Sequence, residues 1–228
     1  MRLAPSAGPV LAALLLCAAL LLPTLASAQQ TGEPGRFDHY VLTLSWSPSY
    51  CEAMGERAEP AQCERARPFA FVVHGLWPQY ARGWPEHCVK PAPFLPEPVL
   101  RSMLDIMPSR RLVLHQWRKH GTCSGEDASA YFASVRRAYE RVTIPEAFRH
   151  LDDYRMVSPG EVEAAFRTAN PGLATDMIAV ACDGRRLTEV RICMNRTLGF
   201  TACEEVDRRA CRASRVVMPP LRNSAGAR

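Results

Sequence analysis

Residues 115–123 read His115-Gln116-Trp117-Arg118-Lys119-His120-Gly121-Thr122-Cys123, and this stretch decides how the rest of the chain is interpreted. At about 100° per residue on a helix, the polar residues Gln116, Lys119 and His120 fall within about 140° of the first histidine. Two imidazoles, an ammonium and an amide therefore share one face, whereas Trp117 points towards the core. Such a cluster of positive and titratable groups is costly for stability and suits an oxyanion such as phosphate.

The residues around this stretch predict the helix that carries it. Ser109 is a suitable N-cap, and we expect the helix to run to about His120, with Gly121 at its C-terminal end. Helical spacing of apolar residues and the Pro and Ser-Pro signals predict three further helices, at residues 99–107, 127–142 and 158–168.

A second motif, FVVHGLWP, occupies residues 71–78. The apolar run over residues 69–73 predicts a buried strand that ends in His74, followed by a glycine turn and an aromatic–proline corner. Other strands are expected at residues 37–46, 176–180, 187–193 and 215–218, and a polar loop at 51–67. Strands, then helices, then strands predict an α+β fold with a central antiparallel sheet packed by several helices.

The composition is that of a globular protein. The chain has 228 residues, 47% of them hydrophobic, and its 28 Lys and Arg against 23 Asp and Glu give a formal charge of +5. These values exclude disorder, collagen and a polytopic membrane protein, and the modest positive charge suits an anionic partner. We expect a single domain over residues 37–218, with a flexible arm at 29–36 and a flexible tail at 219–228.

The first 28 residues have the pattern of a cleaved signal peptide. Arg2 precedes an apolar run over residues 9–22, and Ala26-Ser27-Ala28 is a small-residue cleavage site. A membrane anchor is the alternative, but the run is shorter than the ~20 residues that a spanning helix needs. We therefore expect a mature chain that starts at Gln29, does not associate with a membrane, and is secreted or periplasmic.

Export changes how the cysteines are interpreted. Nine are present, and Cys17 would leave with the signal peptide. Eight in an oxidising compartment suggest four disulfides, although about 105 pairings of eight cysteines are possible. A zinc site is not expected, because no Cys-x-x-Cys pair occurs. His115 and His120 are also one residue too far apart for a His-x-x-x-His zinc pair.

The two motifs resemble the active-site signatures of the T2 family of acid ribonucleases, His-Gly-Leu-Trp-Pro and His-Glu-Trp-x-Lys-His-Gly-Thr-Cys. Two further stretches are similar to the family, FDHYVLTLSWSPSYC from Phe37 and the Leu-x-Glu-Val-x-Ile-Cys stretch that ends at Cys193. The resemblance extends over most of residues 37–217. It implies a monomeric endoribonuclease that needs no metal or cofactor and acts on single-stranded RNA but not on DNA.

The resemblance also implies roles for single residues. His120 would be the general base and His74 the general acid, while His115 would hold the phosphate and Lys119 would stabilise developing negative charge. Attack by the 2′-hydroxyl would leave 2′,3′-cyclic phosphate ends. Two residues are implied more weakly as contacts of an RNA base. These are Trp77, which is as well suited to the core as to stacking, and Gln79.

The disulfide pairing follows in the same way. Cys51–Cys63 is local and would close a polar loop, and Cys88–Cys123 would tie the loop after the first motif to the end of the histidine helix. By resemblance, the last four cysteines nest as Cys182–Cys211 around Cys193–Cys203.

One position departs from the family pattern, because Gln116 stands where the second motif has a glutamate. An amide keeps its hydrogen-bonding capacity but carries no charge to stabilise a nearby cation, and it also removes a repulsion against incoming phosphate. The alternative interpretation is therefore a catalytically weakened relative that binds RNA or another partner. The arginine pairs 185–186 and 208–209 either lie on solvated faces or guide RNA.

Overall fold

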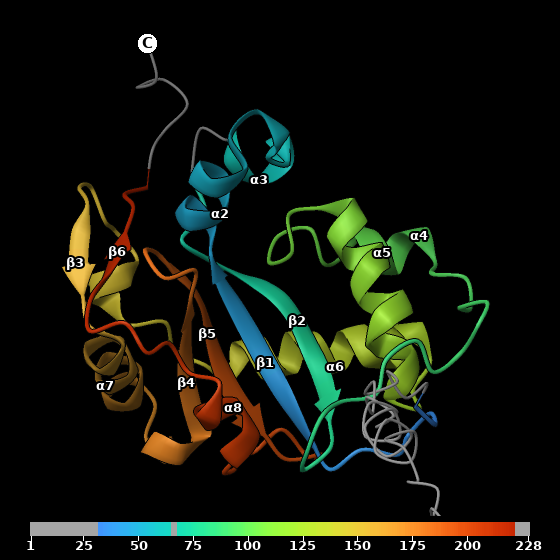
Figure 1. Cartoon of the computed structure of the whole chain (residues 1–228). Helices are drawn as coiled ribbons and strands as arrows, with labels where there is room; N and C mark the ends of the chain where they lie inside the picture. The colour runs from blue at the N-terminus through green and yellow to red at the C-terminus, as the bar shows by residue number, and fades with distance from the viewer. Residues whose placement is uncertain (1–31, 65–67, 222–228) are drawn as a thin grey trace, which may run out of the picture.

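The computed structural model describes residues 32–64 and 68–221 (Figure 1). The expected signal peptide at residues 1–28 lies outside the described residues, as do parts of the expected arm and tail. Residues 32–36 contact the domain: the backbone N–H of Gly35 donates to the carbonyl of Cys123 over 3.0 Å. At the other end, Trp46 Nε1 donates to the carbonyl of Pro219 over 3.0 Å.

A four-stranded antiparallel sheet forms the centre of the molecule (Figure 1). Its strands lie in the order β2, β1, β5 and β4, with bounds Phe71–Gln79, His39–Trp46, Leu187–Met194 and Ile178–Cys182. The central strands β1 and β5 are rich in apolar residues and buried along most of their length, as expected where both faces of a sheet are covered. The predicted α+β fold with a central antiparallel sheet is confirmed.

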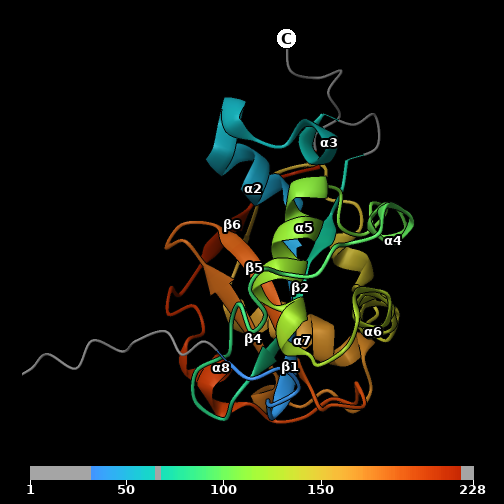
Figure 2. The ribbon, with the colours of Figure 1, turned by 90° about the vertical axis from the view of Figure 1, so that its right-hand side faces the viewer.

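Helices cover this sheet on its far side and at its β2 edge. Helix α6 (Ala128–Glu140) crosses behind β1 and β2, and α7 (Pro159–Ala169) lies beside β4 (Figure 1). Helix α5 (Arg110–Lys119) contacts β2 and lies in front of the sheet when the molecule is viewed as in Figure 2. The two sequence motifs, one on β2 and one on α5, are therefore neighbours in space.

The remaining elements are short. A second sheet pairs β3 (Arg155–Val157) with β6 (Val216–Met218). The other helices and 3₁₀ turns are α2 Ser47–Met54, η2 Gly55–Arg57, α3 Pro60–Cys63, α4 Glu97–Arg101, η3 Gly121–Cys123, η4 Glu146–Phe148, η5 Thr175–Met177 and α8 Glu204–Arg208. Within residues 32–64 and 68–221, no helix is long and apolar enough to cross a membrane.

The structure corrects the polar loop expected at residues 51–67. The end of α2, then η2 and α3 occupy most of this segment as far as Cys63. Pro48 and Pro60 stand in the first turns of α2 and α3, where a missing N–H costs nothing, so these prolines begin helices. The helix expected at 99–107 is also shifted, because α4 begins at Glu97 and ends in turns after Arg101.

The strand expected to end at His74 instead continues to Gln79, because β1 pairs with it along its length. Gly75 therefore lies within a strand and not in a turn. A Cβ at this position would lie 2.2 Å from Gln116 Oε1 and 2.4 Å from Trp77 Nε1, so only glycine lets the α5 side chain approach the strand this closely. His74 lies at a register shift in this strand, because Val73 pairs with Leu44 and Gly75 with Thr43, so His74 is the extra residue between two paired ones.

Four disulfides join the pairs named from the sequence, Cys51–Cys63, Cys88–Cys123, Cys182–Cys211 and Cys193–Cys203. Cys51–Cys63 fastens α2 to α3, and Cys88–Cys123 ties the segment after β2 to η3, which follows α5. The other two bonds fasten the chain near α8 to strands β4 and β5.

Candidate active site

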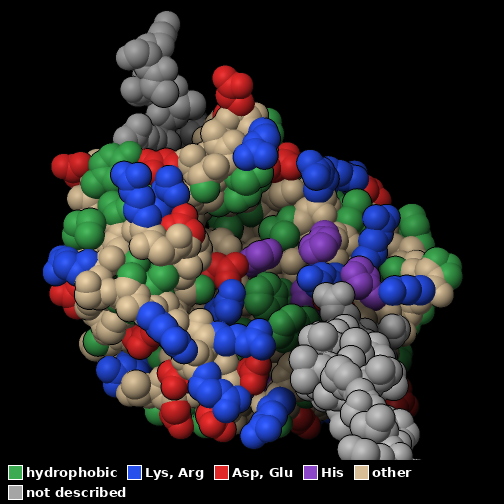
Figure 3. Space-filling view, in the orientation of Figure 1, with side chains coloured by type: hydrophobic (Ala, Val, Ile, Leu, Met, Phe, Trp, Pro, Cys, Tyr) green, Lys and Arg blue, Asp and Glu red, His purple; other side chains and the backbone are tan. Residues whose placement is uncertain are grey.

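A cleft of about 360 Å³ lies between α5, the β2–β1–β5 part of the sheet and α8. The structure brings all seven candidate residues to its walls: His74, Trp77, Gln79, His115, Gln116, Lys119 and His120. The cleft is also lined by Arg209, from one of the two arginine pairs that the sequence left as either solvated or RNA-guiding. Its other lining residues were not given a role from the sequence: Val41, Trp84, Arg191, Glu205 and Val206. Figure 3 shows histidine side chains gathered on one face, with Lys and Arg around them.

Local interactions fix the helix that carries four of these residues. The hydroxyl of Ser109 accepts a hydrogen bond from the N–H of Leu112 over 3.2 Å, which is the expected N-cap. On the core side, Trp117 packs against α6 and donates from Nε1 to the carbonyl of Pro93 over 2.8 Å. Because Trp117 is anchored in this way, the opposite face of α5 is turned towards the cleft.

Trp77 is the central side chain of the site. Its Nε1 donates to Gln116 Oε1 over 2.8 Å. The ring of His120 stacks on it with centroids 5.2 Å apart, and the ring of His74 meets it edge-on at 5.3 Å. Both histidines therefore contact one indole, whose orientation Gln116 fixes.

His74 is held by a carboxylate from a distant part of the chain. Its Nδ1 lies 2.6 Å from Glu189 Oε1, and Arg191 donates to the other oxygen of Glu189 over 2.7 and 3.0 Å. Burial favours the neutral acid, but the hydrogen bond and charge of His74 and the charge of Arg191 outweigh it and lower the pKa of Glu189. A carboxylate only accepts hydrogen bonds, so Nδ1 of His74 carries a hydrogen and Nε2 remains for the cleft.

The histidines of α5 have a different environment. Burial, and then the positive charges of Lys119 and the neighbouring histidines, lower the pKa of His120 to about 2. The same two causes lower the pKa of His115. Nδ1 of His120 is buried and has no hydrogen-bond partner among the described residues, which leaves Nε2 as the nitrogen available to a ligand. His120 is therefore neutral over a wide pH range, with Nε2 as the nitrogen that can bond to a ligand.

Lys119 and Gln79 each have one polar contact. Lys119 Nζ forms an ion pair with Glu86 Oε2 at 3.3 Å, and both side chains are mostly buried. Gln79 is buried, and its Nε2 donates to the carbonyl of Pro78 over 3.0 Å. The ammonium is thereby held at the wall of the cleft, close to the histidines.

The sequence model described as the Ribonuclease T2 family matches residues 37–203. The chain belongs to the Ribonuclease T2 family. A ribonuclease of Aeromonas hydrophila is 33% identical over 210 residues, which cover 83% of this chain and 88% of that protein. Ribonuclease I of Escherichia coli K12 is 31% identical over 210 residues, which cover 73% of this chain and 78% of that protein.

Solved structures share the T2 fold. Trichomaglin, described as a novel S-like ribonuclease, superposes with a TM-score of 0.66 at 20% identity and covers 82% of this chain and 100% of its own. RNase NT, solved in complex with 5′-AMP, has a TM-score of 0.58 at 24% identity, with 81% of this chain and 98% of its own covered. At these identities the likeness is one of fold.

Two carboxylates of this T2 family chain were not given a role from the sequence. Glu189 stands 115 positions from His74, and Glu86 stands 33 positions from Lys119, in the segment between the two motifs. Glu189 lies in the Leu-x-Glu-Val-x-Ile-Cys stretch that supported the family resemblance. An acid within a predicted strand was the signal available, but it did not identify the partner.

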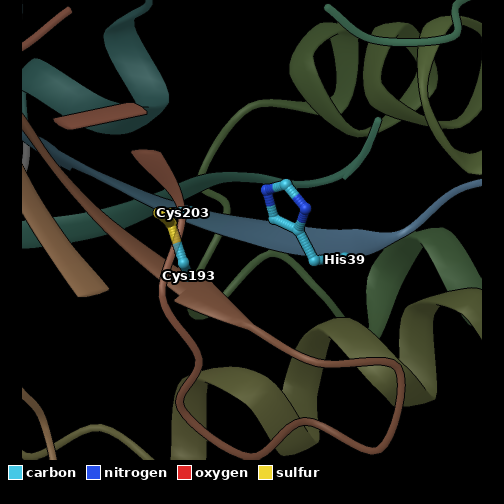
Figure 4. A group of neighbouring side chains, drawn as sticks. All are labelled: His39, Cys193 and Cys203. Carbon is cyan, nitrogen blue, oxygen red and sulfur yellow. A yellow bond between two sulfur atoms is a disulfide. The ribbon is translucent and has the colours of Figure 1, made fainter. Parts of the chain in front are cut away.

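One group of three potential metal ligands gathers in the described part of this T2 family chain, His39, Cys193 and Cys203. Figure 4 shows the imidazole of His39 on β1 near the bond between the two sulfur atoms. Metal coordination by cysteine requires the thiolate. Because both sulfurs are committed to a disulfide, this group is not a metal site.

Proposed function

We propose that this chain is an endoribonuclease that cleaves single-stranded RNA by attack of the 2′-hydroxyl on the adjacent phosphorus. One observation carries the proposal: two histidines contact the same indole, that of Trp77, and have different environments. His120 is buried and neutral, whereas Nδ1 of His74 is hydrogen-bonded to the carboxylate of Glu189. Paired imidazoles in these states suit general base and general acid catalysis.

His120 acts as the base. Its Nε2 takes the proton of the 2′-hydroxyl, and the oxygen forms a new bond to phosphorus. His74 acts as the acid, because its Nε2 gives a proton to the 5′-oxygen as the bond between that oxygen and phosphorus breaks. The products are a 2′,3′-cyclic phosphate and a free 5′-hydroxyl, and the proton balance closes when the histidines exchange their proton with water.

Lys119 and His115 stabilise the charge that builds up on the phosphate oxygens. The side chain of Lys119 lies beside His120, and His115 lies at the exposed side of α5, where it holds the phosphate. Trp77 and Gln79 line the part of the cleft where a base is bound. The nucleophile is the substrate's own hydroxyl, so the reaction needs no metal and DNA is not cleaved.

The rival function, a weakened relative that binds RNA or another partner, is not favoured. The amide of Gln116 accepts the indole N–H of Trp77 and leaves the arrangement of the two histidines intact. The relatives with which the chain aligns over most of its length are named ribonucleases. We also propose that the chain acts as a monomer after export to the periplasm or the medium, where its four disulfides form.

The first test combines substrate, chelator and variants. Wild-type enzyme in EDTA is expected to cleave single-stranded RNA to cyclic-phosphate ends and to leave DNA intact. His74→Ala and His120→Ala are each expected to lower single-turnover cleavage of a dinucleotide by roughly 10²–10⁴-fold, the usual scale for general acid–base groups. His150→Ala, which removes an exposed histidine outside the cleft, is the control.

Binding of RNA without cleavage would support the rival function. If EDTA abolished cleavage and added zinc or magnesium restored it, the metal-free mechanism would be contradicted. Wild-type rates in both His74→Ala and His120→Ala would contradict the assignment of acid and base.

A further inference from the structure

A second hollow adjoins the catalytic cleft. It has a volume of about 760 Å³ and lies between α5 on one side and the α2–η2–α3 segment on the other. His115 lines both the hollow and the cleft, so the two are continuous at this residue. In Figure 3 the histidines lie beside the hollowed part of the surface, with Lys and Arg around them. We name the hollow the basic groove, after the lining residues Arg57, His87, Arg111, His115 and Arg118.

One wall of the basic groove is a stripe along α5. Arg111, His115 and Arg118 follow one another at spacings of four and three residues, so they lie within about 60° of one another on the helix. At ~1.5 Å per residue the stripe is ~10 Å long. All three side chains are exposed. His115, at the middle of the stripe, also lines the cleft; Arg111 lies one turn towards the N-terminus of α5 and Arg118 one turn towards its C-terminus.

The arginine charges of the groove are available to a ligand. Arg57, Arg111 and Arg118 form no ion pair with any other described residue. Arg110 differs, because it donates twice to the carboxylate of Glu97, over 2.7 Å each time. One carboxylate lines the groove, that of Glu59, and its Oε2 accepts from the Ser109 hydroxyl over 3.1 Å. Three arginines against one carboxylate leave the groove with a net positive charge.

Aromatic and apolar side chains complete the lining. Tyr50, Met54 and Leu112 all contribute to the groove. The hydroxyl of Tyr50 accepts from the backbone N–H of Glu59 over 3.2 Å, which fixes the position of its ring. Cations that follow a backbone, together with an aromatic ring on which a base stacks, are how proteins bind single-stranded nucleic acid without sequence preference.

We propose that the basic groove binds nucleotides of the RNA strand beyond the two that flank the scissile phosphate. Arg111 and Arg118 contact successive phosphates on the α5 wall, Arg57 contacts the strand from the opposite wall, and Tyr50 stacks on a base. The groove does not read sequence; it makes longer strands better substrates. This proposal rests on the proposed ribonuclease function.

The test compares a short and a long substrate that contain the same cleavable linkage. The short one is a dinucleotide, and the long ones are DNA octamers with one ribonucleotide, extended on either its 5′ or its 3′ side. The readout is the ratio of kcat/KM for octamer over dinucleotide. We expect the wild type to favour one of the octamers, and Arg111→Ala/Arg118→Ala to lower that ratio by roughly 3- to 30-fold, the scale of two exposed ion pairs.

Salt dependence gives a second readout. Loss of two contacts to single-strand phosphates should reduce the slope of log kcat/KM against log salt for the octamer by about 1.4. Arg110→Ala is the matched control, because it removes the same charge from the adjacent position of α5 and does not line the groove. Melting temperatures of the variants confirm that each one is folded.

The outcomes distinguish failure of the groove proposal from failure of the ribonuclease function. The groove proposal alone is contradicted if the wild type cleaves the dinucleotide and Arg111→Ala/Arg118→Ala has the same octamer-to-dinucleotide ratio and the same salt slope as the wild type. An equal fall in Arg110→Ala shows a general effect of charge and also overturns the groove. A wild type that cleaves neither substrate contradicts the ribonuclease function itself, and the groove proposal falls with it.

Discussion

Glu189 positions the imidazole of His74, the proposed general acid, through the hydrogen bond to Nδ1. Glu189→Gln keeps an oxygen that can accept this hydrogen bond but removes the negative charge. A hydrogen bond to a charged group is stronger than a neutral one by about 1–1.5 kcal/mol, so kcat should fall by roughly 10-fold.

Separate values of kcat and KM are the measurement for this variant. A positioning role lowers kcat with little change in KM, while the melting temperature stays near that of the wild type. Glu97→Gln, which removes the charge of an α4 carboxylate that accepts from Arg110, is the control. A fall in kcat that merely follows a loss of folded protein would show that Glu189 holds only the structure.

Gln116 offers a different residue-scale test. The side chain is buried, and a glutamate in its place could still accept the Trp77 N–H. The added charge would stabilise the cations of α5 in the transition state, and a charged hydrogen bond of about 1–3 kcal/mol corresponds to an increase in kcat of about 5- to 150-fold. Single-turnover kinetics of Gln116→Glu measure this. An increase in KM with kcat unchanged would instead mean that the carboxylate repels phosphate.

The sequence predicted the site better than it predicted the contacts within the site. Two motifs of chemically unusual residues were enough to select His74 and His120 as partners. Each motif can be recognised from neighbouring residues in the sequence, without knowledge of the fold. Glu189 could not be paired with His74, because the contact depends on the register of β5 against β1 and of β1 against β2. The sequence also gave no sign that Gln116 would bond to Trp77.

At the scale of elements, the position of α5 depends on its N-cap. Ser109→Ala removes the acceptor for the Leu112 N–H and also the donor to Glu59. We expect the free energy of unfolding to fall by about 0.5–2 kcal/mol, the usual cost of losing an N-cap. Urea denaturation with an unchanged m-value measures this, and Ser102→Ala at the exposed end of α4 is the control. Equal stability of Ser109→Ala and wild type would contradict this role.

Elements with their own end signals were predicted most accurately. Helices α5, α6 and α7 begin after Ser109, Asp127 and Ser158, and each of these side chains caps its helix as a polar residue at that position should. The α2–η2–α3 segment was not predicted, because short helices held by a disulfide have no apolar period. The end of β2 was misplaced because Gly75 resembles a turn residue until its close neighbour on α5 is known.

At the scale of the whole molecule, stability should fall in acid. His120 takes up a proton only near pH 2 in the folded chain, but at about pH 6.5 when unfolded. Below pH 6.5 the unfolded chain therefore binds a proton that the folded chain does not, and stability is lost by up to about 1.4 kcal/mol per pH unit. The lowered pKa values of His39 and His115 act in the same direction.

Thermal unfolding between pH 7 and pH 5 measures this loss. The melting temperature of the wild type should decrease over this interval, and that of His120→Ala should decrease less, because one of the contributing groups is absent. Identical slopes for the two proteins would contradict the buried, neutral state of His120.

The bond between Cys88 and Cys123 has a consequence for the cell that makes the protein. It lies three residues beyond His120, and the segment that it fastens also holds Lys119 through Glu86 and through the N–H of His87, which donates to the Lys119 carbonyl over 2.8 Å. Disulfides do not persist in a reducing cytoplasm. We therefore expect a newly made chain to lack this link for as long as it stays in a reducing compartment, so that the segment holding Lys119 is fastened only where disulfides can form.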